Sequence, residues 1–366
     1  MSTSTLPNDQ QSGRAVAIDN LLLNCAKMRA GTTLLFVNEN GTDAVSRDTV
    51  EAIEARAREL GANVTSLWLD HVPGPEDMPP AVLGAVAASD VAVFTHNMGG
   101  LLRLRPVPGN GLVVHNYVGT DAMLDSPWSR VPYGLWEKIS GIIAREFAAA
   151  HQWRIRDDRG TDITGTIPES ERSAPAQSDG FTVSTFPIGT HRPTSAHSAN
   201  GTLALEWLVS SANHDVGEGF RLDQPVIAHV EQGRVVNLTG DAGSVSKVRS
   251  QLESAGKLTG QDPYTLSSWH GGVNPQAFTA WKDVADLSRW QTLAHNNPRL
   301  VHFHIVGEET PGEISLPLLD PTVTFDGNVF WERGNFKLLE LPAVQAELAR
   351  HAGPERPFEL NRTIGI

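Results

Sequence analysis

The sequence has a single cysteine, Cys25, in 366 residues, so it can form neither an intramolecular disulfide nor a multi-cysteine zinc or iron–sulfur site. It also lacks any run of about 18 consecutive apolar residues, which excludes a transmembrane helix. Its 29 Lys and Arg are outnumbered by 42 Asp and Glu, and no basic cluster interrupts that excess. Nucleic acid and anionic membrane surfaces are therefore poor partners.

The N-terminus has no charged segment followed by an apolar one, so no secretory signal is expected. Residues 1–18 are predicted to be a disordered tail. Because a lone cysteine fits a reducing compartment, we expect a cytoplasmic protein. What the sequence does have is histidine: there are 13, several of them close together in the C-terminal half.

Residues 19–150 alternate apolar strands with amphipathic helices, which is typical of an α/β domain with a parallel sheet. One helix is predicted to begin after Ser46 or Asp48 and to end at Gly61. Ligands of open α/β sheets collect beyond the carboxyl ends of the strands, which is where His96 lies. Strands are predicted at residues 32–37, 63–69, 91–95 and 112–114.

Residues 151–366 are richer in Gly, Pro, Ser and Thr, and short alternating strands replace the long helices. We predict a β-rich α+β domain here, which carries the active site, with one helix at residues 243–255. The polar segment 169–180 is a candidate mobile loop or lid. Strands are predicted at residues 153–156, 161–166, 203–209, 225–230, 235–238, 300–306, 316–319, 323–325 and 328–331.

His302 and His304 are separated by one residue within a predicted strand, so period-two alternation places both imidazoles on one face. This spacing is typical of metal ligands, and a carboxylate such as Glu313 often completes a catalytic site. His270 opens a glycine-rich turn where the backbone can approach a ligand closely. The alternative for the pair is one histidine satisfying backbone groups and one facing solvent.

Other candidates are weaker. His191 and His197 lie in a segment without hydrophobic periodicity, where a surface loop with chance histidines is the alternative interpretation. Trp269 and Phe303 are candidates for the wall of a flat substrate pocket, although aromatic residues beside strands are also typical of a core. Asn274, in the glycine-rich turn, is a further substrate-binding candidate. A Ser/His/Asp triad is not supported, because no Gly-x-Ser-x-Gly elbow is present.

A series of short motifs resembles the aminopeptidase T family of metallopeptidases (M29), including its divergent dihydroxypyridine dioxygenase branch. The similarity spans residues 19–336, and the total length is closer to the dioxygenase branch. The motifs are Gly160-Thr161-Asp162, Ala199-Asn200-Gly201-Thr202-Leu203, Pro225-Val226, Gly233-Arg234-Val235-Val236, Gly272-Val273-Asn274-Pro275, Asp320-Pro321-Thr322-Val323 and Asp326-Gly327.

The resemblance implies an M29-like fold, a metal in the C-terminal domain, a homo-oligomer and a functional histidine at His96. This sequence departs from the family at the ligands. The His-x-Asp pair of the family falls at Glu313 and Ser315, and its first ligand falls near Ser268. The glutamate of the peptidases falls at Thr190 or His191. His270, His302 and His304 are therefore candidates for ligands that have moved within one cavity.

These observations predict a metal-dependent enzyme that acts on a small aromatic or N-heterocyclic substrate. The leading hypothesis is a mononuclear Fe(II) dioxygenase, with Zn, Co or Mn as alternative metals. His96 would then shuttle a proton, with His191 and His197 as further catalytic candidates. One alternative is an M29-type hydrolase. The other is a metal-free enzyme or binding protein that uses histidine acid–base chemistry at His96 and His270.

Overall fold

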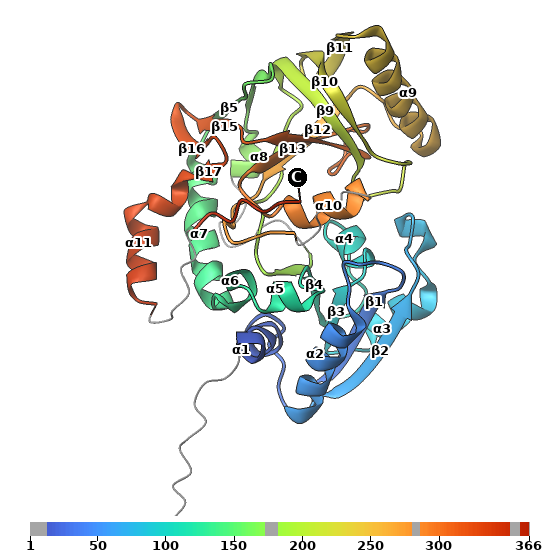
Figure 1. The fold of residues 1–366 in the computed structure, drawn as a ribbon, viewed down its shortest axis with the longest axis vertical. Helices are drawn as coiled ribbons and strands as arrows, with labels where there is room; N and C mark the ends of the chain where they lie inside the picture. Colours follow the sequence, from blue (N-terminus) through green and yellow to red (C-terminus); the bar gives the residue numbers. More distant parts are fainter. Residues whose placement is uncertain (1–12, 173–181, 280–285, 352–358, 366) are drawn as a thin grey trace, which may run out of the picture.

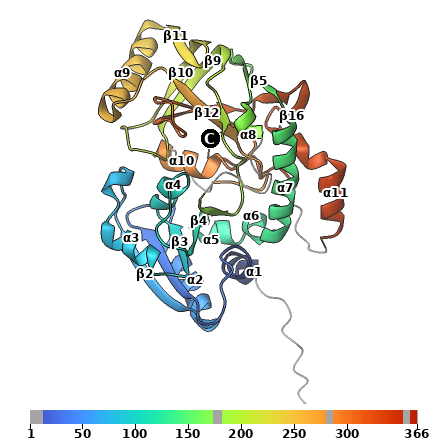
Figure 2. The same cartoon turned by 180° about the vertical axis from the view of Figure 1, so that it is seen from behind.

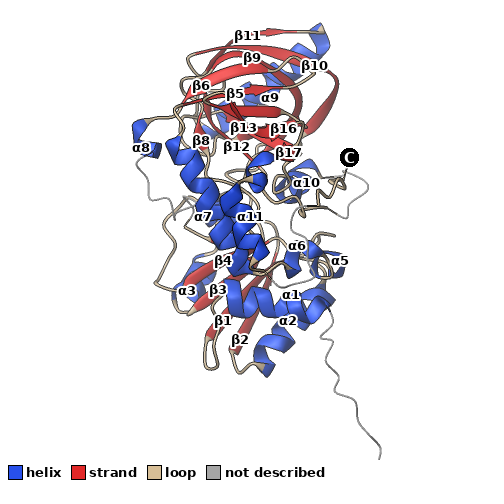
Figure 3. Cartoon of the chain, turned by 90° about the vertical axis from the view of Figure 1, so that its left-hand side faces the viewer, coloured by secondary structure: helices blue, strands red, loops and turns tan. Residues whose placement is uncertain are grey.

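The computed structural model describes residues 13–172, 182–279, 286–351 and 359–365. Within these residues the chain forms two sheets, one parallel and one strongly curved and antiparallel, with long helix α7 (Tyr133–Ala149) running between them (Figures 1 and 3). The other described α-helices are α1 (Gly13–Asp19), α2 (Arg47–Glu59), α3 (Pro80–Ala87), α4 (Met98–Leu102), α5 (Asp121–Leu124), α6 (Pro127–Arg130), α8 (Glu169–Arg172), α9 (Ala242–Thr259), α10 (Leu287–Ala294) and α11 (Pro342–Ala349). A π-helix, η1 (Asn20–Cys25), and two 3-10 helices, η2 (Pro75–Asp77) and η3 (Lys337–Glu340), complete the described helical segments.

The parallel sheet has the order β2-β1-β3-β4-β7. Leu34 and Phe36 of β1 face Ile53 and other apolar residues on one side, and Leu35 packs with residues of α3 on the other. Burial on both faces explains the continuous apolar runs from which these strands were predicted. The strands are β1 (Thr33–Glu39), β2 (Asn63–Leu69), β3 (Val91–Thr95), β4 (Leu112–Asn116) and β7 (Ser184–Phe186).

The antiparallel sheet follows the order β17-β16-β15-β5-β6-β9-β14-β13-β12-β8, and β10 extends it from β9 to β11. Helix α9 packs against β10 on the outside of this sheet (Figure 2). The strands are β5 (Gln152–Arg156), β6 (Asp162–Thr166), β8 (Thr194–Ser195), β9 (Asn200–Ser210), β10 (Phe220–Glu231), β11 (Arg234–Thr239), β12 (Leu266–Gly271), β13 (Leu300–Ile305), β14 (Ile314–Leu319), β15 (Thr322–Phe325), β16 (Asn328–Glu332) and β17 (Asn335–Phe336).

Local signals in the sequence fix several of these boundaries. Ser46 caps α2, since its Oγ accepts the Thr49 N–H, and Gly61 follows that helix with φ +89°. The tail predicted over residues 1–18 ends earlier, because α1 buries Ala17 and Ile18 against the core. Residues 1–12 and most of the segment 169–180 lie outside the described residues.

The division into two domains at residue 150 stays a prediction. Strands β5 and β6, which follow that residue directly, belong to the antiparallel sheet, whereas β7 returns to the parallel sheet beside β4. No described helix combines the length and the apolar character that a bilayer crossing needs.

We expect the Cys25 thiol to be unreactive in the folded protein. It is 1% exposed in the apolar core, and burial raises its pKa to about 12, so almost no thiolate forms at neutral pH. An aromatic disulfide reagent at pH 8 should label about one thiol per chain in guanidinium chloride and none in the native protein. Native labelling at the rate of the unfolded chain would contradict this burial.

Candidate metal centre

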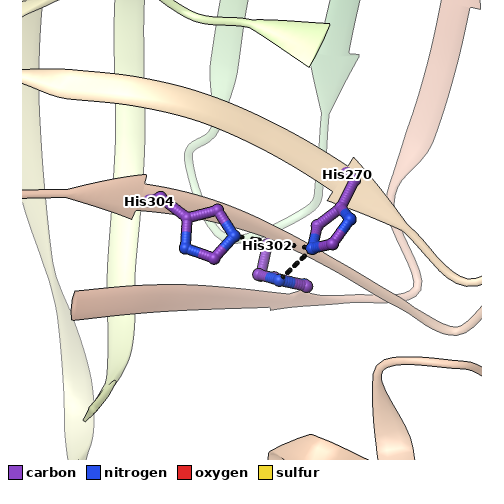
Figure 4. A group of neighbouring side chains, drawn as sticks. All are labelled: His270, His302 and His304. Carbon is purple, nitrogen blue, oxygen red and sulfur yellow. Dashed lines mark hydrogen bonds between the residues drawn. The ribbon is translucent and has the colours of Figure 1, made fainter. Parts of the chain in front are cut away.

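The candidate centre is formed by three histidines on two paired strands. Strand β12 pairs antiparallel with β13, and the register sets His270 opposite His302 and Ser268 opposite His304. Because residues directly opposite each other share a face of the sheet, all three imidazoles project to the same side (Figure 4). His270 thus lies in a strand that leads into the glycine-rich turn, rather than in the turn itself.

The three Nε2 atoms converge. His270 Nε2 lies 2.7 Å from His302 Nε2 and 3.4 Å from His304 Nε2. One nitrogen from each residue lies within 4.8 Å of the other two, and all three side chains are buried. Imidazole nitrogens bound to one ion at about 2.1 Å are separated by roughly 3.0–3.4 Å in octahedral or tetrahedral geometry. The two separations from His270 Nε2, 2.7 and 3.4 Å, lie close to this range, so the three histidines are a candidate site for a single divalent metal ion.

Electrostatics keep these imidazoles neutral, which is the form that binds metals. Burial, together with the smaller effect of the positive charge of Arg103, lowers the pKa of His304 to about 3. Burial also holds the pKa values of His270 and His302 well below the usual range, and the neighbouring histidines add to that effect. Each neutral imidazole has a lone pair on one ring nitrogen, and in the contact between His270 and His302 one Nε2 donates while the other accepts. A metal ion bound by both Nε2 atoms would take the place of that shared hydrogen.

Four buried polar side-chain atoms in and beside the cluster lack a hydrogen-bond partner among the described residues. Among the described residues, His302 Nδ1 and His304 Nδ1 have no hydrogen-bond partner, and neither do the hydroxyls of Ser268 and Ser315. The two serines flank His304, one on β12 and one on β14. Metal-bound histidines usually donate their second N–H. A buried polar group without a partner calls for an explanation, and a bound ion with its associated water is one such explanation at this site.

The histidines face a cavity of about 820 Å³ between the two sheets. The antiparallel sheet supplies one wall, and the carboxyl ends of β1, β3 and β4 supply another. Eight of the 13 histidines line this cavity: His71, His96, His115, His214, His270, His295, His302 and His304.

Glu313, the predicted carboxylate ligand, is outside the histidine cluster among the described residues. Its Oε1 accepts a hydrogen bond from Asn213 at 3.1 Å, and its Oε2 pairs with His214 Nδ1 at 2.8 Å. These partners hold the carboxylate away from the three imidazoles. Its role as a ligand stays a prediction that this geometry does not favour.

His96 lines the cavity directly after β3, as predicted. Its Nε2–H donates to the Asp70 carbonyl at 2.9 Å, and its Nδ1 accepts the Met98 N–H at 3.1 Å. Burial lowers its pKa to about 4. Two backbone partners and this low pKa favour a fixed, neutral imidazole. Both ring nitrogens of His96 are thus occupied in this arrangement, and its role as a proton shuttle stays a prediction.

Neither of the two loop histidines lines the cavity. His191 is stacked on Phe147, its Nε2 accepts the Gly271 N–H, and its Nδ1–H donates to the Arg192 carbonyl. It therefore holds the backbone at the end of β12, directly beside His270. His197 is exposed in a turn and does not line the cavity. Neither position supports the catalytic role predicted for it.

The three predicted substrate-binding residues do not line the cavity. Trp269 and Phe303 alternate with the histidines along their strands, so they project to the opposite face, where they pack with Trp153. Asn274 is fully buried, donates to the Ile188 carbonyl and accepts the Gln276 N–H, which shapes the turn. Trp269 and Phe303 therefore belong to the aromatic core, and Asn274 stabilises the turn.

The cavity also contains residues that the sequence did not single out. Arg103, which follows α4, is buried and donates to the hydroxyls of Tyr117 and Thr190. His115 packs against Tyr117 in a tilted arrangement, with 4.5 Å between ring centroids. His295 donates Nδ1–H to the Gln291 carbonyl, and burial lowers its pKa to about 3. Of these residues, His115 directly follows the strand predicted at residues 112–114, and this position beyond a strand end is the signal that could have found it.

An ion pair joins the two walls near the cavity rim. Glu39, at the end of β1, has a fully buried side chain and pairs with Arg289 of α10. The same carboxylate contacts His71 Nδ1 at 3.0 Å and accepts the Asn97 N–H at 3.0 Å. Three groups from distant parts of the sequence therefore meet around one carboxylate, and this fixes α10 over the parallel sheet.

No protein-family model matches the chain, and no curated protein matches it in sequence. Among solved structures, 2,5-dihydroxypyridine dioxygenase from Pseudomonas putida KT2440 is similar, with a TM-score of 0.56 and 15% identity, over 92% of this chain and 100% of that one. The AmpT aminopeptidase from Thermus thermophilus gives a TM-score of 0.48 and 10% identity, over 88% and 98%. The resemblance stated from the sequence is thereby confirmed at the level of the fold.

We expect about one divalent ion per chain in protein purified anaerobically, and we expect the double variant His302→Ala/His304→Ala to lose it, because one imidazole alone holds a metal weakly. Elemental mass spectrometry measures the content directly. His197→Ala is the matched control, since it removes an exposed imidazole outside the cavity. Equal metal content in the double variant and the wild type would exclude this centre.

We expect the metal-free protein to lose stability in mild acid. Burial lowers the pKa of His191, His295 and His304 to about 3 against 6.5 in model peptides, so protons bind the unfolded chain preferentially. The free energy of unfolding should be level above pH 6.5 and fall below it, by about 1.4 kcal/mol per such histidine at pH 5.5.

Urea unfolding with a chelator at pH 7.5 and 5.5 measures this loss. His191→Gln keeps a donor and an acceptor but does not titrate, so its difference between the two pH values should be smaller by about 1.4 kcal/mol. An identical pH dependence in the two proteins would show that His191 is not buried in its neutral form.

Proposed function

We propose that this protein is a mononuclear non-haem Fe(II) enzyme that acts on a small aromatic or N-heterocyclic substrate, as a ring-cleaving dioxygenase. The observation that carries this proposal is the convergence of three buried, neutral imidazoles on one point at the wall of a cavity. Three protein ligands leave coordination positions open, which is typical of catalytic rather than structural metal sites.

The roles of the chain's own residues follow from their positions. His270, His302 and His304 would hold the metal, and a bound Fe(II) would supply redox chemistry toward O₂ together with Lewis acidity. His191 fixes the backbone beside His270 through the Gly271 N–H. Arg103 and Tyr117 form a polar wall near the same cavity. The cavity volume of about 820 Å³ is ample for a single aromatic ring.

The fold supports the oxygenase over the hydrolase. A TM-score of 0.56 with full coverage of the dihydroxypyridine dioxygenase is a likeness of fold, and both neighbours are enzymes. A hydrolase of the peptidase type needs a base to activate water. At the position where the resemblance places that glutamate, Thr190 accepts a hydrogen bond from Arg103, and the alternative residue, His191, is occupied by backbone partners.

We expect Fe(II)-loaded protein to consume O₂ in the presence of hydroxylated pyridines or catechols. His304→Ala should lower the rate at least about 100-fold, since losing a ligand costs more than the roughly 10- to 100-fold typical of its supporting contacts. His197→Ala should keep the wild-type rate. An oxygen electrode measures both. Zinc- or cobalt-dependent amide hydrolysis without O₂ uptake, or full activity in both His302→Ala and His304→Ala, would overturn the oxygenase assignment.

A further inference from the structure

Two serines occupy matching places on the strands to either side of His304. Ser268 of β12 and Ser315 of β14 are both paired directly with His304 of β13. Directly paired residues share a face of the sheet, and their Cα atoms lie roughly 4.5–5.5 Å apart. The two hydroxyls and the imidazole therefore belong to one row of side chains that crosses three strands.

Each member of this row has a buried polar atom without a partner. Ser268 Oγ, His304 Nδ1 and Ser315 Oγ make no hydrogen bond to any described residue, and the three residues are at most 4% exposed. Alanine would fill either serine position at nearly the same volume and without an unpaired hydroxyl. Orphaned hydroxyls on both sides of one orphaned ring nitrogen call for a common explanation.

Metal binding supplies that explanation. The His304 atom that faces the other histidines of the cluster is Nε2, which lies 3.4 Å from His270 Nε2. An imidazole whose Nε2 coordinates a metal carries its hydrogen on Nδ1, and that N–H then needs an acceptor. Rotation about the Cα–Cβ bond moves a serine hydroxyl between staggered positions, so a neighbouring Oγ can turn to accept it.

The other two histidines of the cluster have different surroundings. His270 Nδ1 faces the His191 carbonyl at 3.4 Å. The residue of β14 that is paired with His302 is Pro317, whose side chain has no polar atom. Of the three described histidines, His304 is thus the one with a hydroxyl opposite it on both neighbouring strands.

We propose that Ser268 and Ser315 are positioning residues for the metal, and that one of their hydroxyls accepts the Nδ1–H of His304 while His304 Nε2 binds the ion. The inference rests on the proposed function, since it takes the three histidines to hold a divalent ion. The hydrogen bond holds the ring in the orientation and the tautomer that coordination requires. In the metal-free protein both hydroxyls are unpaired, so they contribute nothing to stability there.

The test measures Zn²⁺ affinity of full-length protein at pH 7.5 by competition with a chromophoric chelator. Ser268→Ala/Ser315→Ala should weaken Zn²⁺ binding about 10- to 100-fold. Urea unfolding without metal should show this variant to be at least as stable as the wild type, because the change removes unpaired buried hydroxyls. Ser267→Ala is the matched control. Ser267 Oγ accepts the Gly312 N–H at 3.1 Å, so this variant should lose stability and keep the wild-type affinity.

The outcomes separate the two proposals. A Zn²⁺ affinity of the double variant within about twofold of the wild type would overturn the positioning role and leave the metal centre standing. Lower stability of the metal-free double variant, or its failure to fold, would also overturn it, because the hydroxyls would then serve the fold. Equal weakening in Ser267→Ala would do the same. Failure of the wild-type protein to bind zinc or iron would overturn the proposed function and this inference together.

Discussion

The antiparallel register between β12 and β13 is the constraint on which the candidate site depends. It sets His270 directly opposite His302 and sets His304 beside both, so the convergence of three imidazoles follows from backbone pairing rather than from loop placement. A slip of one residue in either strand would turn its histidines into the aromatic core on the other face. The Gly271 N–H that His191 binds and the tryptophan packing of Trp269 both hold this register.

Burial accounts for the chemistry of the site as well as for its shape. Imidazoles removed from water give up their protons, and a guanidinium nearby reinforces the effect, so the cluster is kept in its metal-binding form. The same burial also lowers the stability of the folded chain wherever a ring nitrogen has no hydrogen-bond partner. His191 and His96 avoid that cost with backbone partners on both nitrogens, which indicates that they shape the cavity rather than react.

Much of the fold was predictable because its signals are local. The runs at residues 63–69 and 91–95 are strands with those bounds, and the same alternation that puts His302 and His304 on one face could have placed Phe303 on the other. The sequence could not predict which residues from distant elements the topology brings together. Arg103 and His295 come from distant elements that have no common pattern in the sequence. Strand β12 was missed because its serines and glycine read as a turn.

The row Ser268–His304–Ser315 runs across three adjacent strands on one face of the sheet. Its two serines occupy the positions at or near which the resemblance places family ligands, and the histidine stands between them. Neighbouring positions of such a row point into the same space, so point substitutions can move a coordinating group sideways while the backbone stays unchanged. Such a shift leaves the architecture in place, and this chain shares its fold with a solved enzyme structure although no family model matches its sequence.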